Sequence, residues 1–116
     1  PERITAENLS REIVLDGVRA AAAHLARSVD DDGRYRYMVD ATTNVTLPGY
    51  NWPRHAGATF FLAQAAAVLD DPFVRHAALR AAAHLRDEMM RDCGSNRCIA
   101  SDDDPIEIGS RCSSEM

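Results

Sequence analysis

The chain has 116 residues, which is room for one small domain, and its 46% hydrophobic and 27% charged content is that of an ordinary globular protein. The formal net charge of −5 argues against a nucleic-acid-binding protein, which needs a basic face. No run of residues reaches the roughly 18–20 apolar positions that span a bilayer. We therefore expect no nucleic-acid partner and no membrane span.

The first part of the chain has the pattern of an amphipathic helix. Apolar residues recur at steps of three and four from Leu15 to Val29, which predicts a helix that begins between residues 5 and 8. Thr5 and Ser10 are both suitable as its N-cap. Three consecutive aspartates and Gly33 then end the helix, because carboxylates are unfavourable at a helix C-terminus and glycine favours a turn.

The following segment favours β-structure. Residues 34–39 alternate with period two, and residues 42–47 are rich in β-branched side chains. We expect these two stretches to pair as a small, irregular β-hairpin between the first and second helices, closed by Pro48 and Gly49.

A second helix is predicted over residues 56–69, and a third from Pro72 to about Arg91. Thr59 and Gln64 are the only polar residues of the second helix, which predicts burial on every side. A chain of this size rarely surrounds such a helix alone, so we expect either further chain or a self-association partner to cover it. Asp71 is a suitable N-cap for the third helix, with Pro72 at its first position.

A short segment recurs along the chain. Residues 21–25 and residues 81–85 both read Ala-Ala-Ala-His-Leu, about sixty residues apart, which is the size of a helical hairpin with its loops. The recurrence indicates either a structural repeat or a coincidence between alanine-rich helices. Residues 106–110 have the pattern of an approach to a fourth helix. We therefore expect residues 1–116 to form a single partial domain, truncated at its C-terminus.

Several motifs resemble those of bacterial α/α-toroid proteins. They are Tyr-Arg-Tyr at residues 35–37, Tyr-Asn-Trp-Pro-Arg-His-Ala-Gly-Ala at residues 50–58, Asp-Pro-Phe at residues 71–73 and Ile-Glu-Ile-Gly at residues 106–109. Terpenoid cyclases and the helical domain of glucuronyl C5-epimerases share this toroid architecture. The resemblance implies an all-α fold, namely a toroid fragment of two helical hairpins with the small β-hairpin between the first and second helices. It also implies a carbohydrate-active or uronic-acid-processing function.

The candidate active site lies at the start of the second helix. Arg54 opposes the positive end of the helix dipole there, so we expect it to have an anionic partner. That partner is either a carboxylate or sulfate of an acidic sugar, or an internal carboxylate such as Asp40 or one of the aspartates at 30–32. His55 is the candidate general base, and the alternative is a structural histidine hydrogen-bonded to the backbone.

Aromatic residues cluster before the same helix. Tyr35, Tyr37, Tyr50 and Trp52 are candidate substrate-binding residues because aromatic rings stack on sugars, and the alternative is that they pack locally in the hairpin core. Whether the chain is an enzyme stays open. The rival interpretation is a non-catalytic helical-repeat or small-bundle protein that acts through protein contacts.

The cysteines offer one further candidate feature. Cys93 and Cys98 bracket a turn-forming tetrapeptide, so they are either a disulfide pair or free thiols, and a pair would favour an extracytoplasmic location in a bacterium. Their spacing does not indicate zinc, and the aspartates at 102–104 lack the ligand spacing of a calcium loop. We expect no metal and no cofactor.

Overall fold

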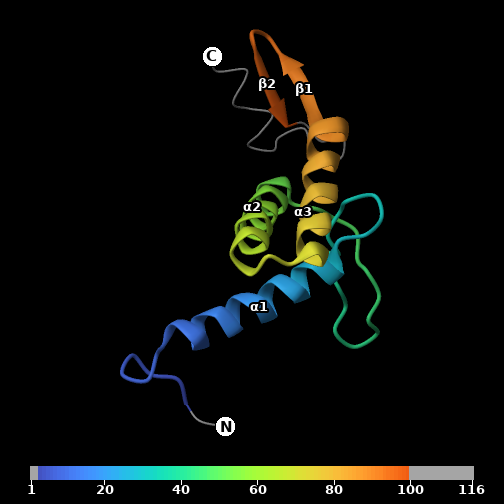
Figure 1. Cartoon of the computed structure of the whole chain (residues 1–116). Helices are drawn as coiled ribbons and strands as arrows, with labels where there is room; N and C mark the ends of the chain where they lie inside the picture. The colour runs from blue at the N-terminus through green and yellow to red at the C-terminus, as the bar shows by residue number, and fades with distance from the viewer. Residues whose placement is uncertain (1–2, 100–116) are drawn as a thin grey trace.

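The computed structural model describes residues 3–99 and contains three packed helices followed by a β-hairpin. The elements are α1 (Arg11–Ser28), α2 (Trp52–Leu69), α3 (Pro72–His84), a π-helical turn η1 (Leu85–Met89), β1 (Met90–Cys93) and β2 (Asn96–Ile99). In Figure 1, α2 and α3 lie side by side, α1 crosses near their lower ends, and the hairpin extends from the far end of α3.

The predicted fold class is wrong. The described chain is not a pair of helical hairpins, and it is not all-α, because it has three α-helices and an antiparallel strand pair that follows α3. Between α1 and α2 the structure has only two isolated bridges, Val29 with Tyr35 and Val39 with Thr46, in place of the expected hairpin. One reason is that the backbone N–H of Arg36 donates to the Ser28 carbonyl at the end of α1, at 2.9 Å, and not to a neighbouring strand.

The C-terminal part of the described chain also differs from prediction. The third helix was expected to reach Arg91, but its α-helical part ends at His84, and residues 90–93 form β1. The strands pair with Met90 opposite Ile99 and Cys93 opposite Asn96, around a turn in which Gly94 adopts a φ of 64°. The structure joins Cys93 to Cys98 by a disulfide across this hairpin. The predicted lead-in at 106–109 and the aspartates at 102–104 lie outside the described residues.

Alanine dominates the core between the three helices. Small side chains allow helix axes to approach closely, and only a few larger side chains fill the space between them. The buried apolar residues are Ala22, Ala26 and Val29 from the end of α1, Leu62, Ala65 and Ala66 from α2, and Val74, Ala77, Ala78 and Ala81 from α3.

The second helix is not buried on every side as predicted. Phe60 is 66% exposed and Val68 is 62% exposed, both on the side of α2 that faces away from the core. Within residues 3–99, no helix combines the length and the apolarity that crossing a membrane requires.

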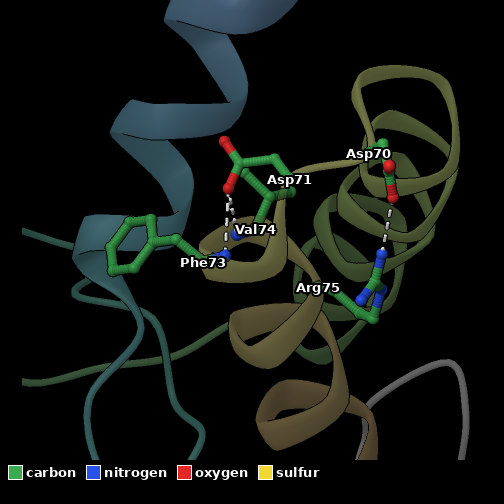
Figure 2. A network of polar contacts seen from close by, with 5 residues as sticks. All are labelled: Asp70, Asp71, Phe73, Val74 and Arg75. Carbon is green, nitrogen blue, oxygen red and sulfur yellow. Dashed lines mark hydrogen bonds and ion pairs between the residues drawn. The ribbon is translucent and has the colours of Figure 1, made fainter.

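Local capping fixes where the helices begin. Ser10 caps α1, and the side chain of Asn51 accepts from the Arg54 N–H at 2.8 Å, so α2 begins at Trp52, four residues before the predicted start. Figure 2 shows the junction of α2 and α3, where the Asp71 carboxylate accepts from the backbone N–H groups of Phe73 and Val74. Asp70 adopts a left-handed conformation with φ of 50° and forms an ion pair with Arg75 at 3.1 Å.

The loop after α1 is held tightly against α3. Gly33 has a φ of 91°, and a Cβ atom at this position would lie 2.3 Å from the carbonyl oxygen of Arg80. Nearby, His84 Nδ1 lies 2.8 Å from the Asp32 carbonyl oxygen, so it carries the proton and donates it. These contacts fix the start of the segment that carries Tyr35 and Tyr37.

Candidate functional site

His55 lies at the centre of a polar network beneath the start of α2. Its side chain is 2% exposed, and both of its ring nitrogens have protein partners. Nε2 lies 2.8 Å from the carbonyl oxygen of Ala81 on α3, and Nδ1 lies 2.8 Å from the hydroxyl of Tyr50. A carbonyl only accepts, so Nε2 carries the proton and Nδ1 accepts from the Tyr50 hydroxyl.

The two tyrosines extend the network to the loop. The Tyr50 hydroxyl accepts from the backbone N–H of Tyr35 at 2.7 Å while it donates to His55. The Thr59 hydroxyl donates to the His55 carbonyl one turn earlier, at 2.7 Å, and thereby accepts from the Tyr35 hydroxyl at 3.0 Å. The network therefore ties the loop to α2 and α3 with the donors and acceptors matched.

Burial shifts the pKa values of this network away from ionisation. Desolvation is the largest cause that lowers the pKa of His55, although its hydrogen bond to the Ala81 carbonyl opposes the shift, and the charges of His84 and Arg34 lower the pKa further. Desolvation likewise raises the pKa of Tyr35 and raises the pKa of Tyr50 to about 12. The network is consequently neutral around pH 7.

Trp52 completes an aromatic cluster around His55. Its ring is almost fully buried, stacks on His84 at a centroid distance of 5.7 Å, and tilts against Tyr50 at 4.6 Å. The guanidinium of Arg34 covers the Tyr50 ring at 4.5 Å from its centroid, which is a cation–π contact. Trp52 is therefore a packing residue. It does not line the cavity that lies between the end of α1, the loop over 35–51 and the start of α2.

Arg54 points toward this cavity and not toward an internal carboxylate. Its Nη1 donates to the Tyr37 hydroxyl at 2.9 Å, and its guanidinium lies 5.7 Å from the Tyr37 ring centroid. Among the ion pairs that the structure shows within residues 3–99, none involves Arg54, so neither Asp40 nor the aspartates at 30–32 neutralise it.

A cavity of about 650 Å³ lies between the end of α1, the loop over 35–51 and the start of α2. Its volume is within the range of small-molecule sites. Its wall contains three arginines and two histidines but no aspartate or glutamate, in a chain whose net charge is −5. The lining residues that matter for its charge and shape are Arg27, Arg36, Arg54, His24, Tyr37 and Tyr50.

Several of these residues were missed by the sequence analysis. Arg27 lies in the last turn of α1, and its position off the apolar stripe was the only signal that it faces outward. Arg36 is fixed in place, since its guanidinium donates to the Thr46 hydroxyl at 2.7 Å and to the side chain of Asn44 at 3.1 Å. Of the predicted site residues, the structure brings Tyr35, Tyr37, Tyr50, Arg54 and His55 to the same cavity.

Among the described residues, no group of three histidine, cysteine, aspartate or glutamate side chains is arranged to hold a metal ion. Comparison with family models, with curated proteins and with solved structures finds no match to this chain.

Proposed function

We propose that the chain binds an acidic carbohydrate in the cavity at the start of α2. The observation that carries the proposal is the charge of the wall, which contains three arginines and no carboxylate. A cavity of this kind attracts an anion, because guanidinium groups bind carboxylates and sulfates through parallel N–H donors. The resemblance to proteins that process uronic acids supports a sugar as the carrier of that anion.

The arginines have different roles in this proposal. Arg36 already donates to Thr46 and Asn44, so it holds the loop and contributes charge at a distance. Arg54 has one donor engaged with a neutral hydroxyl and keeps others for a ligand. Arg27 adds a second charge to the wall from α1, and Tyr37 offers a ring on which a sugar can stack.

We propose that the cavity binds the carbohydrate and does not catalyse its conversion. A general base needs a ring nitrogen within hydrogen-bond reach of the substrate proton, whereas both nitrogens of His55 are engaged by Tyr50 and Ala81. In this proposal His55 is a positioning residue that holds Tyr50 and the first turn of α2 in place. A catalytic role for His55 stays a prediction that would require these two hydrogen bonds to open.

The test is titration with trigalacturonate, with maltotriose as the neutral control. Trp52 is the only tryptophan in the chain and contacts Tyr50 of the cavity wall, so its fluorescence reports occupancy. We expect trigalacturonate to bind with a Kd in the millimolar range or below, maltotriose to bind at least about tenfold more weakly, and added salt to weaken the binding.

Arginine variants locate the site. Arg54→Gln and Arg27→Gln should each raise the Kd by about tenfold, as expected for a charge-assisted hydrogen bond. Arg11→Gln removes the same charge about 24 Å further along α1 from Arg27 and should leave the Kd unchanged. Equal binding of the two trisaccharides, or an equal loss in all three variants, would refute the proposal.

A further inference from the structure

The outer face of α2 is apolar and uncovered within the described part of the chain. Gly57, Phe60, Gln64 and Val68 recur at steps of three and four, so they share one side of the helix, and all four are exposed. No charged residue occurs between Arg54 and Asp70. Exposed helix faces normally carry charges, and charge depletion is typical of the centre of a protein interface.

The pattern on this face is symmetric about Gln64. Phe60 lies four residues before it and Val68 lies four residues after it. A two-fold axis that crosses α2 at Gln64 therefore places Phe60 of each chain against Val68 of the other. The same contact forms twice in the dimer. It also sets the two Gln64 side chains against each other, where each amide can both donate and accept.

Charge favours the same antiparallel arrangement. The N-terminal end of α2 carries Arg54 and the positive end of the helix dipole. Its C-terminal end carries the negative end of the dipole and two aspartates, Asp70 and Asp71, against Arg75, which pairs with Asp70. An antiparallel second copy brings each acidic end beside a basic end. Gly57 has no side chain, which allows a second helix to approach closely. The position is open, since a Cβ atom there would meet nothing within 4 Å.

We propose that the chain forms a two-fold symmetric homodimer through α2, with Gln64 on the axis. The single polar pair at the centre fixes the register, as a buried polar residue does in a coiled coil. One helix face is small beside the usual 800 Å² or so per partner, so we expect a micromolar dimer. Phe60 and Val68 do not line the cavity, so substitutions at these two positions test dimerisation without altering a residue of the cavity wall.

The first test is sedimentation velocity of the whole chain from about 1 to about 500 µM. We expect a concentration-dependent monomer–dimer equilibrium. Phe60→Glu should raise its Kd by about tenfold or more. Leu79→Glu, at a residue that is 60% exposed on α3, should leave the Kd unchanged. A monomer over the whole range, or a dimer insensitive to Phe60→Glu, would overturn the proposal.

The second test measures the register in a Cys112→Ser background, which removes the third cysteine of the sequence and leaves Cys93 and Cys98. Gln64→Cys should give a disulfide-linked dimer on mild oxidation, because facing Cα atoms on the axis come within the reach of a disulfide. Phe60→Cys alone should not, since the two equivalent positions are about 12 Å apart along the helices. An equal mixture of Phe60→Cys and Val68→Cys should cross-link. Cross-linking of Phe60→Cys alone in preference to Gln64→Cys would rule out this register.

Discussion

At the scale of single residues, His55 organises the start of α2. It is buried as a neutral imidazole, and its two hydrogen bonds join the loop hydroxyl of Tyr50 to the backbone of α3. A buried polar group of this kind is costly when a partner is lost, because its desolvation is no longer compensated. Tyr50 is the most informative position to change, since its hydroxyl satisfies two groups at once.

Tyr50→Phe should lower the free energy of unfolding by about 2–3 kcal/mol. The substitution keeps the ring under Arg34 but leaves His55 Nδ1 without a donor and the Tyr35 N–H without an acceptor. Urea denaturation followed by circular dichroism measures the change.

Tyr37→Phe is the matched control for this experiment. It removes a hydroxyl whose partner, Arg54, is exposed to solvent, so it should cost less than about 1 kcal/mol. Equal effects of the two substitutions on stability would show that the network around His55 does not stabilise the fold as described.

At the scale of elements, local signals in the sequence predicted the helices and failed for the strands. The spacing of apolar residues indicated the three helices, and Ser10 and Asp71 cap α1 and α3, because these features act within one or two turns. The predicted starts of two helices were wrong, since α1 begins at Arg11 and not at residues 5–8, and α2 begins at Trp52 and not at residue 56. The hairpin after α3 was missed because Met90 and Arg91 continue the helical pattern of α3, and strand pairing depends on contacts between segments.

The candidate site shows the same division between local and long-range information. The aromatic and basic residues around Arg54 were found because they are adjacent in the sequence. Arg27 and Ala81 reach the site only through the packing of α1 and α3, which no local pattern in the sequence encodes.

Substitution by alanine should have opposite effects on stability at Gly33, in the loop after α1, and at Gly17, within α1. Gly33→Ala should destabilise the fold by about 2–4 kcal/mol, because its φ is positive and the new Cβ would meet the Arg80 carbonyl oxygen of α3. Gly17→Ala, within α1 and with no atom near the new Cβ, should stabilise it by about 0.5–1 kcal/mol. Thermal unfolding of both variants measures the contrast, and destabilisation by Gly17→Ala would show that something covers this part of α1.

At the scale of the whole molecule, the buried network should limit stability on the acid side. The pKa of His55 is lowered in the folded chain below its ordinary value of 6.5, mainly by desolvation. Below about pH 6.5, His55 binds a proton in the unfolded chain but not in the folded chain. The free energy of unfolding therefore falls as the pH falls. Above that pH both states are neutral at His55 and this contribution to the pH dependence disappears.

The same network should limit stability on the alkaline side. The pKa of Tyr50 rises from 10.0 to about 12 on folding, and that of Tyr35 also rises. Between these values the unfolded chain loses protons that the folded chain keeps, so stability falls as the pH rises above about 10. The free energy of unfolding should therefore be greatest between about pH 7 and pH 9 and decline on both sides.

Urea titrations at a series of pH values, together with NMR titration of the histidine ring signals, test both limbs. His55 should stay neutral in the folded chain at pH values just below 6.5, the ordinary pKa of histidine, because its own pKa is lowered by burial. In Tyr50→Phe the alkaline decline should become shallower, because one of the two tyrosines with a raised pKa is gone. A His55 ring that protonates at or above pH 6.5 would contradict the buried neutral imidazole on which both the stability argument and the binding proposal depend.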